Sequence, residues 1–424
     1  MLKEKDKIFS NLYGFKDRSI DSVISRGQWD GTAKFIKNGS SWIIEEIKNS
    51  GLRGRGGAGF PTGLKWSFAP KEIGSRPHYL VINADESEPG TCKDRDILRY
   101  NPHSIIEGML IASYAIGASV AYNYLRGEFI DEQKRVFDEA LKIAYQENLV
   151  GKDILSSSVS IDIYSLIGAG AYIVGEETAM LESIEGKRGM PRIKPPFPAI
   201  KGLFGKPTII NNTETLASVP KIMRNEPDWY KNIGIGDSEG IKMFCTSGHL
   251  EKPGNYEIPL GTPFRDLLEL SGGVLNKGEL KAVIPGGSSV PVVKGETMLQ
   301  LNMDYESISS AGSMLGSGGV IVMDHTTCMV SVLQRISRFY YAESCGQCTP
   351  CREGTGWLYK MLTNILEGKG TISDLDTLNR IASQIEGHCI CALGDAAAMP
   401  VRSFLKNFWH EFEYYVDKKQ SMVS

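Results

Sequence analysis

The sequence predicts an α/β region, then an α+β module, then an all-α C-terminal region, and three observations support this order. Apolar runs typical of buried strands alternate with helical segments in the first part of the chain. From about Lys242 the segments become short and alternating, and after about Thr326 the apolar spacing is helical to the end. A chain of 424 residues is also too long for one ordinary core, so several packed units are expected.

The elements of the α/β region follow from these patterns. Residues 42–48 have helical spacing and end at the stop signal Asn49-Ser50-Gly51, and residues 79–84 form an apolar run typical of a buried strand. Further expected elements are a helix from about Ser104, a strand near Val120, a strand at residues 159–164 and a helix after Gly170. Residues 191–207 are rich in proline and glycine, which indicates a loop.

The α+β module is expected to contain a β-hairpin, a helix and a strand. Residues 242–246 and 254–258 alternate as hairpin strands do, residues 263–270 suit a helix, and residues 280–284 suit a strand. The segments after Thr326 are spaced as amphipathic helices.

Composition and charge exclude several classes of protein. The net charge of −3 lacks the basic excess of nucleic-acid-binding proteins, and the start of the chain has no apolar core of a secretory signal. Residues 108–125 carry no charge but contain too many polar side chains for a membrane span, which favours a buried helix. Eight cysteines without an export signal indicate a reducing compartment, and five of the eight lie between positions 345 and 391.

Three of these cysteines, Cys345, Cys348 and Cys351, form a triplet with two-residue gaps. Such gaps let three thiolates face one centre, with Gly346 and Pro350 supplying turns. Three thiolates from one loop and one remote cysteine commonly hold a [4Fe–4S] cluster. Zinc is the main alternative, although zinc sites usually have two paired cysteine knuckles.

The residues alone leave two candidates for the fourth ligand, Cys389 and Cys391, and His388 keeps a mixed ligand set open. Cys92, Cys245 and Cys328 are isolated, and we interpret each as a free thiol.

Glycine-rich segments predict sites where a ligand approaches the backbone. Residues 54–59, with Lys65 nearby, have this character but match neither a Walker loop nor the usual dinucleotide fingerprint. Residues 168–178 lie between an expected strand and helix, where anions bind, and residues 208–215 offer amides to a flavin. A flavin is the usual converter between a hydride from nicotinamide and the single electrons of an iron–sulfur cluster.

Together these motifs resemble the NADH-binding flavoprotein subunit of respiratory complex I. The resemblance covers nearly the whole chain and rests on five motifs in the family's order: residues 54–63 with Lys65-Trp66, residues 83–90, residues 168–177, residues 194–198 and the cysteine triplet. It implies three domains: a Rossmann-like FMN- and NADH-binding domain with an N-terminal extension at residues 1–225, a small ubiquitin-like domain (a β-grasp for soluble ligands) at 226–325, and a helical bundle with the [4Fe–4S] cluster at 326–424.

The resemblance also implies site residues. Those matching the family's FMN cavity are Gly54, Arg55, Gly56, Lys65, Asn83, Asp85, Glu86, Tyr172, Gly175, Glu176, Glu177, Asn211, Asn212 and Thr215. Those matching its NADH site are Gly57, Phe60, Lys65, Phe68, Glu88, Glu177, Lys194 and Phe197, of which Glu88 and Glu177 lie near the nicotinamide and are the catalytic candidates. The family's fourth cluster ligand matches Cys391, so Cys389 departs from the pattern without a clear role.

The function implied is that of the NADH-oxidising subunit of NADH:quinone oxidoreductase. Hydride would pass from NADH to FMN without a protein base, and single electrons would leave through the cluster towards quinone. The expected partners are a thioredoxin-like [2Fe–2S] subunit and the large iron–sulfur subunit of the peripheral arm, and the expected place is the inner face of the membrane, or the matrix side in mitochondria, without insertion. Two alternatives remain: the flavin subunit of an NAD-linked hydrogenase or formate dehydrogenase, and a zinc-bearing structural subunit without redox activity.

Overall fold

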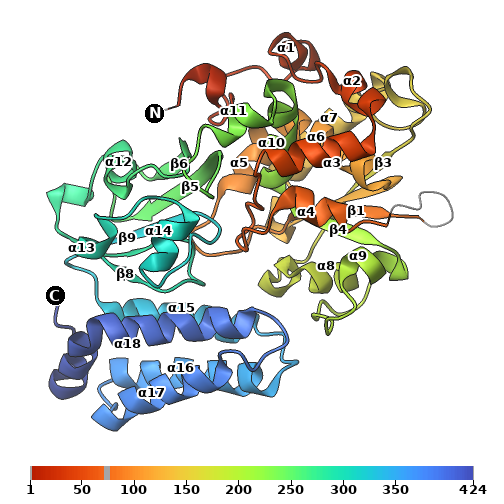
Figure 1. The fold of residues 1–424 in the computed structure, drawn as a ribbon. Coiled ribbons are helices and arrows are strands. Elements are labelled where there is room, and N and C mark those ends of the chain that lie inside the picture. The colour runs from red at the N-terminus through yellow and green to blue at the C-terminus, as the bar shows by residue number, and fades with distance from the viewer. Residues whose placement is uncertain (1, 71–76, 424) are drawn as a thin grey trace. The chain divides into compact units, whose positions relative to one another are not determined.

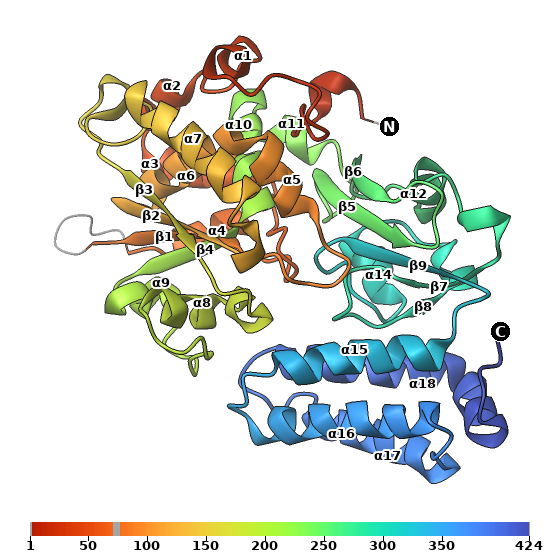
Figure 2. The ribbon, with the colours of Figure 1, turned by 180° about the vertical axis from the view of Figure 1, so that it is seen from behind.

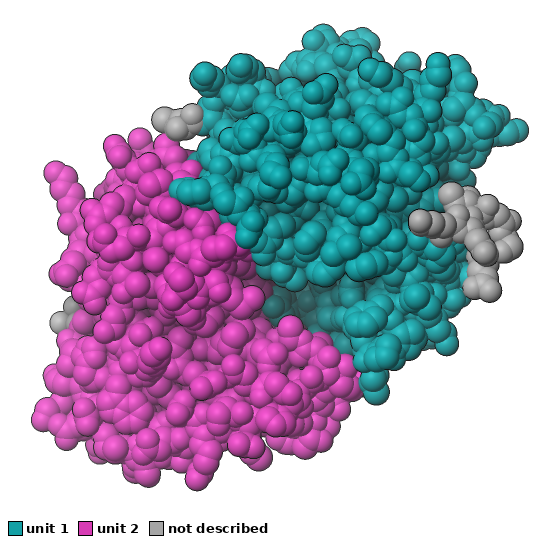
Figure 3. All heavy atoms as spheres, in the orientation of Figure 1, with its two compact units in different colours: residues 1–87, 92–243, 257–261 teal, residues 88–91, 244–256, 262–424 magenta. Residues whose placement is uncertain are grey.

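The computed structural model describes residues 2–70 and 77–423 and divides into two compact units (Figure 3). Unit 1 consists of residues 1–87, 92–243 and 257–261. Unit 2 consists of residues 88–91, 244–256 and 262–424.

Unit 1 is built on a four-stranded sheet with the order β3-β2-β1-β4. Its strands are β1 (Tyr79–Ala84), β2 (Val120–Leu125), β3 (Asp162–Ile167) and β4 (Thr208–Asn212). All three strand pairs are parallel, with Leu80 of β1 opposite Ala121 of β2 and Ile209 of β4. Parallel strands need helical crossovers, so the carboxyl ends of all four strands meet at one edge, which we call the carboxyl edge.

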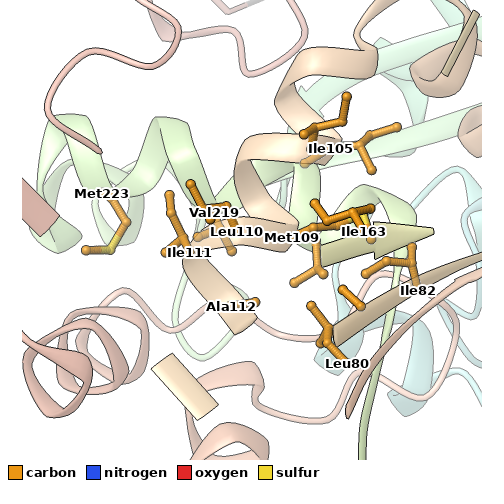
Figure 4. Close-up of a cluster of buried hydrophobic side chains, with 14 of the residues drawn as sticks. Leu80, Ile82, Ile105, Met109, Leu110, Ile111, Ala112, Ile163, Val219 and Met223 are labelled. Carbon is orange, nitrogen blue, oxygen red and sulfur yellow. The ribbon is translucent and has the colours of Figure 1, made fainter. Parts of the chain in front are cut away.

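Two helices supply most of the core beneath this sheet, α6 (Pro102–Ile116) and α10 (Thr213–Asn225). Nearly every side chain of α6 is buried, because the helix is apolar on all sides. Figure 4 shows Leu80 and Ile82 of β1 beside Met109 of α6, with Val219 of α10 in the same cluster.

Helices α6 and α10 approach each other backbone to backbone at Gly108. A Cβ atom at this position would lie 2.0 Å from the carbonyl oxygen of Leu216, so only glycine fits. Pro220 lies four residues after Leu216 and has no N–H group to donate to that carbonyl. The contact is therefore set by one missing side chain and one missing amide proton.

The other helices of unit 1 cover both faces of the sheet. Figures 1 and 2 show α3, α6 and α10 on one side and α8 and α9 on the other. The remaining helices, including the short 3₁₀ turns (η), are η1 (Glu4–Asp6), α1 (Ile20–Ser25), α2 (Thr32–Asn38), α3 (Ser40–Asn49), α4 (Thr62–Ser67), α5 (Lys93–Tyr100), η2 (Gly127–Phe129), α7 (Glu132–Gln146), η3 (Ile154–Ser156), η4 (Tyr172–Gly175), α8 (Glu177–Ile184), α9 (Pro198–Lys201), η5 (Leu203–Gly205) and α11 (Pro227–Lys231).

Unit 2 contains a five-stranded mixed sheet with the order β6-β5-β9-β7-β8. Strand β9 is parallel to β5 and antiparallel to β7, and it joins the two halves of the sheet. The elements are β5 (Ile241–Gly248), β6 (Gly254–Pro259), α12 (Phe264–Leu270), η6 (Leu275–Lys277), β7 (Leu280–Ile284), β8 (Val293–Lys294), α13 (Gly295–Met298), α14 (Tyr305–Ser310) and β9 (Gly319–Asp324), the first residues of β5 and the last of β6 belonging to unit 1.

Four long helices complete unit 2: α15 (Met329–Glu343), α16 (Thr349–Leu366), α17 (Ile372–Ile385) and α18 (Leu393–Lys418). Each buries one apolar stripe against its neighbours, as the helical spacing predicts. No helix within residues 2–70 and 77–423 is both long and apolar enough to span a membrane.

The coarse prediction of a parallel α/β region, an α+β module and C-terminal helices is confirmed. Four details were wrong. The strand expected at residues 159–164 runs from Asp162 to Ile167, the predicted loop at residues 191–207 includes α9 and η5, and neither β4 nor β9 was predicted as a strand. The uncharged run at residues 108–125 is the end of α6 followed by β2, so it is not one helix.

Candidate functional site

The carboxyl edge gathers segments that are far apart in the sequence. Strand β1 is followed by Asp85 and Glu86, β3 by the segment 168–178, and β4 ends at Asn211-Asn212. The Asn83 side chain donates a hydrogen bond of 2.7 Å to the Gly175 carbonyl. This bond fixes the segment after β3 to the end of β1.

The loop of residues 53–61 closes on itself and lies against this edge. The Gly54 N–H donates to the Phe60 carbonyl at 2.8 Å, and Gly57 and Gly59 have positive φ angles of 141° and 65°. The Arg55 N–H donates to the Thr215 hydroxyl at 2.9 Å, at the start of α10. A Cβ atom on residue 56 would lie 3.1 Å from the Cβ of Asn212, so the glycine permits the close approach.

The end of β4 is held by its own side chains. Asn212 caps α10 by accepting hydrogen bonds from the N–H groups of Glu214 and Thr215. Its Nδ2 donates to Asp94 Oδ2 at 2.6 Å, and the Asn211 Oδ1 accepts a hydrogen bond of 2.9 Å from the Trp66 indole. Both asparagines are therefore fixed before any ligand binds.

A buried group of charges lies behind this edge. Lys93 forms ion pairs with Asp94 at 2.8 Å and Glu214 at 2.9 Å, and Lys242 lies 3.8 Å from the same Glu214 carboxylate. Burial opposes ionisation of Glu214, but Lys242, Lys93 and Arg55 outweigh it and lower its pKa. Burial also works against the charge on Lys93, and Asp94 and Glu214 nevertheless raise its pKa. The loop is tied to this group, because Lys242 Nζ donates to the Arg55 carbonyl at 3.3 Å.

At this edge the pKa of Glu86 is raised strongly, to about 8. Burial is the main cause and the nearby Asp94 carboxylate the second. Its oxygens accept hydrogen bonds from the N–H groups of Asp94 and Arg95 at the start of α5, at 2.8 and 3.0 Å. These bonds fix the carboxyl group at the end of β1.

Two glutamates and two lysines form a second charged group beside the first. Glu176 caps α8 and accepts a hydrogen bond of 2.9 Å from Lys194, and Glu177 pairs with Lys194 at 2.8 Å and Lys65 at 3.3 Å. Burial acts against ionised Glu177, but Lys65 and Lys194 lower its pKa. The carboxylate is therefore ionised and already shared between two cations.

Exposed aromatic rings accompany these charges. Phe60 and Phe68 have ring centroids 6.2 Å apart, and their exposed fractions are 45% and 51%. Phe197, at the start of α9, is 57% exposed. Rings that are half exposed in solution offer flat apolar faces to a planar ligand.

Glu88 belongs to unit 2, unlike Glu177. Its carboxylate accepts a hydrogen bond of 2.8 Å from the N–H of Ser289. A Cβ atom at Gly287 would lie 2.6 Å from the Glu88 Cγ, so this glycine leaves the room that the glutamate occupies.

The cysteines meet where two helix connections lie together in unit 2. Cys345 and Cys348 lie between α15 and α16, Cys351 lies in the first turn of α16, and Cys391 lies between α17 and α18. The Ile390 N–H donates to the Cys348 sulfur at 3.3 Å, which brings the second connection to the first.

Burial and the neighbouring thiols dominate the electrostatics of this site. Burial raises the pKa of Cys351, and the neighbouring Cys345 and Cys348 raise it further. Burial likewise raises the pKa of Cys389 to about 12, with Cys351 and Cys348 adding to the shift. Within residues 2–70 and 77–423, no three His, Cys, Asp or Glu side chains converge tightly enough to hold one metal ion. The donor set fits an iron–sulfur cluster, whose irons would remove the repulsion between the thiolates.

Comparison with known proteins decides the family. Residues 47–221 match the Nuo51 FMN-binding domain, residues 243–293 the SLBB domain, and residues 331–415 the NADH-ubiquinone oxidoreductase-F iron-sulfur binding region. The F subunit of the NADH-quinone oxidoreductase of Rickettsia bellii (strain OSU 85-389) is 53% identical over 415 residues, covering 97% of this chain and 99% of the relative. An F-type subunit of the same enzyme in Rhizobium meliloti (strain 1021) is 52% identical, covering 99% and 96%. The chain belongs to the family of NADH-quinone oxidoreductase F subunits.

A solved structure is also similar to this member of the family. A chain of the NAD+-reducing [NiFe]-hydrogenase in the H2-reduced state superposes with a TM-score of 0.82 at 34% identity, covering 95% of this chain and 67% of that chain. The resemblance to the complex I flavoprotein is thus confirmed, with FMN and a [4Fe–4S] cluster as the cofactors. The zinc alternative is wrong, because the cysteine region is an iron-sulfur binding region.

The buried charges Lys93, Glu214 and Lys242 were not found from the sequence. A lysine on a helix is usually solvent-exposed, and no local pattern reveals that distant segments bury this one. The capping pattern Asn212-Thr213-Glu214-Thr215 was the available signal, since it places Glu214 at the start of a helix.

Proposed function

We propose that this chain is the electron-input subunit of an NADH:quinone oxidoreductase, in which bound FMN takes the hydride from NADH and the [4Fe–4S] cluster takes single electrons onward. The main support is that one chain contains matches to an FMN-binding domain and to an iron–sulfur binding region. The chain is also 52–53% identical to F subunits over nearly its whole length. The residues of this chain would bind FMN and NADH, orient them for hydride transfer and pair with the charges of both molecules.

The FMN site that we propose is the carboxyl edge of unit 1. The loop 53–61 permits close approach of a ligand through its glycines, and Lys65 supplies a cation for a phosphate. The residues assigned to FMN are Gly54, Arg55, Gly56, Lys65, Asn83, Asp85, Glu86, Tyr172, Gly175, Glu176, Glu177, Asn211, Asn212 and Thr215. In support, hydrogen bonds join Asn83 to Gly175 and Arg55 to Thr215 directly. Asn212 and Glu86 are joined through Asp94.

The NADH site that we propose combines the aromatic rings with the lysine–glutamate group. Phe60, Phe68 and Phe197 would stack the planar rings of the dinucleotide. Lys65, Lys194 and Gly57 would meet its phosphates, and Glu177 and Glu88 its ribose and nicotinamide. Cys345, Cys348, Cys351 and Cys391 would hold the cluster.

The finer domain description is also a proposal. It comprises a Rossmann-like domain at residues 1–225, a ubiquitin-like domain at 226–325 and a cluster-binding bundle at 326–424. A subunit of complex I has partner subunits, and we propose a thioredoxin-like [2Fe–2S] subunit and the large iron–sulfur subunit. The place that we propose is the inner face of the membrane, without insertion.

An anaerobic titration with NADH tests the function directly. NADH supplies two electrons, whereas FMN takes two and the cluster takes one, so about one and a half equivalents of NADH should bleach the flavin absorbance of the purified holoprotein and produce an EPR signal of the reduced cluster. A preparation that contains both cofactors and keeps its flavin absorbance with excess NADH would contradict the proposal.

Replacing Glu177 by Gln tests the NADH site. The ionised Glu177 carboxylate repels the extra phosphate of NADPH, and the substitution removes its charge but not its size. We expect the ratio of kcat/KM for NADH to that for NADPH to fall about tenfold, or about 1.4 kcal/mol. Glu139→Gln, on the exposed side of α7, is the matched control. An unchanged ratio in Glu177→Gln would remove this residue from the site.

A further inference from the structure

The helix connections of unit 2 bring five cysteines together, and four ligands account for a [4Fe–4S] cluster. The fifth is Cys389, which lies in the connection between α17 and α18, two residues before Cys391. The family assigns no role to Cys389, so we infer its role from its place in the fold.

Cys389 and Cys391 flank the residue that joins this connection to the cysteine triplet. The Ile390 N–H donates to the Cys348 sulfur at 3.3 Å, so both cysteines are one residue from a fixed point. The Cys389 thiol is half-buried and donates a hydrogen bond of 3.7 Å to the Ile385 carbonyl. Cys389 therefore lies beside the triplet without being fully exposed to solvent.

A glycine provides the room that this sulfur occupies. A Cβ atom on Gly394, in the first turn of α18, would lie 2.6 Å from the Cys389 sulfur and 2.8 Å from its Cβ. On the other side of Cys389, Gly387 has a φ of +74°, and its N–H donates to the Asp395 carboxylate at 2.7 Å. The connection is thus anchored at Gly387 and Ile390, with Cys389 held between the two anchors.

We propose that Cys389 is a reserve ligand of the cluster, able to bind the fourth iron in place of Cys391. The proposal rests on the cluster of the proposed function and adds a residue to it. In the exchange, the iron–sulfur bond to Cys391 breaks and one to Cys389 forms, and the proton of the Cys389 thiol passes to the Cys391 thiolate. No electron moves, so the oxidation state of the cluster is unchanged.

His388 is the competing donor in this connection. Its Nδ1 is 2.8 Å from the Glu386 carbonyl oxygen, which engages the ring with its own backbone. A hydrogen-bonded ring nitrogen leaves only Nε2 as a ligand. The experiment therefore separates His388 from Cys389.

The experiment compares alanine variants of the full chain, reconstituted anaerobically with iron and sulfide. The readouts are iron and sulfide per chain and EPR spectra of oxidised and reduced samples, since loss of one ligand converts a [4Fe–4S] cluster to a three-iron form that is paramagnetic when oxidised. We expect Cys391→Ala to keep four irons with an altered EPR signal of the reduced cluster, and Cys389→Ala to keep four irons with an unchanged signal. The double variant should lose the fourth iron, whereas His388→Ala in the Cys391→Ala background should keep it.

Three results would overturn the proposal: loss of the fourth iron in Cys391→Ala alone, its retention in the double variant, or its loss in His388→Ala/Cys391→Ala. Cys328→Ala, at the start of α15, controls for the removal of a thiol from unit 2.

A measurement on the unaltered chain avoids any folding defect of the variants. Cys389 is half-buried, and burial raises its pKa, so N-ethylmaleimide should label it slowly in the cluster-loaded protein and leave the iron-bound Cys391 unlabelled, as determined by peptide mass spectrometry. Labelling of Cys391 with protection of Cys389 would reverse the two roles and overturn the proposal. A chain that binds no cluster under any condition would instead contradict the proposed function.

Discussion

The carboxyl edge of unit 1 and the cysteine site of unit 2 are organised in opposite ways. At the carboxyl edge the buried charges already have partners, as Lys93, Asp94 and Glu214 show. At the cysteine site, burial and then the neighbouring Cys345 and Cys348 thiols raise the pKa of Cys351. The charges of the first site are therefore already paired within the protein, whereas the thiolates of the second site would be stabilised by the binding of iron. Substitutions at the two cofactor sites should therefore have different effects: loss of the cluster at one, and loss of stability or of flavin binding at the other.

The largest expected effect is at the cysteine site. Replacing Cys351 by Ala removes one of the four ligands of the cluster, so we expect complete loss of the four-iron form. FMN content should stay at one per chain, because the flavin residues belong to unit 1. Iron, sulfide and flavin analyses of one preparation check both statements. Loss of FMN together with the cluster would show that the two sites are not independent.

The next effect is at the buried charges of unit 1. Lys93→Met leaves Asp94 and Glu214 without their closest cation, which we expect to cost about 3–5 kcal/mol of the unfolding free energy of unit 1. Flavin release during urea denaturation measures it. The control is Arg135→Met, which breaks the exposed ion pair with Glu139 and should cost less than about 1 kcal/mol. Equal losses in both variants would contradict the distinction between buried and exposed charges.

A pH effect of similar size is expected from His103, at the start of α6. Burial lowers the pKa of His103 from 6.5 to about 4, so the folded chain keeps it neutral while the unfolded chain takes up a proton below pH 6.5. Its contribution is fully present above pH 6.5 and is lost as the pH falls towards 4, by about 3 kcal/mol.

His103→Gln should therefore lose less stability between pH 7.5 and pH 4.5 than the unaltered chain, as measured by thermal unfolding of unit 1. If both proteins lose the same amount, His103 is not the titrating group.

The smallest effect tests how the glycine loop is attached to α10. Thr215→Ala removes the hydroxyl that accepts a hydrogen bond of 2.9 Å from the Arg55 N–H, and we expect the loop to lose about 1–2 kcal/mol of stabilisation. If all of this energy stabilises the FMN-bound form, the dissociation constant of FMN should rise about fivefold to thirtyfold. Thr215→Ser keeps the acceptor and should bind FMN normally. Weak binding by the serine variant would assign the effect to packing of the methyl group.

Local pattern was enough to predict the elements that carry their own signals. Residues 79–84 are apolar except for Asn83 and form β1 with these bounds, and the stop signal after Lys48 ends α3 at Asn49. The cysteine triplet identified the cluster region because the chemistry of the ligands needs that spacing.

The remaining features depend on contacts between distant segments. The apolar run Val320-Ile321-Val322 of strand β9 is too short to be assigned to a strand by its pattern alone, and its pairing with β5 and β7 makes it one. Likewise, Arg55 and Thr215 are 160 residues apart, and their hydrogen bond is a product of the fold. The assignments of residues to FMN and NADH stay predictions until the variants are measured.

The contact of Gly108 with Leu216 has a consequence for changes to the sequence. Alanine is the best helix former at most helix positions, yet at 108 its methyl group would meet the Leu216 carbonyl at 2.0 Å. An alanine at 108 would therefore lower the stability of the protein although alanine favours a helix, because the Leu216 carbonyl of α10 occupies the place of its methyl group. Because α10 begins at the cap formed by Asn212, any shift of this helix would also move that end of the carboxyl edge.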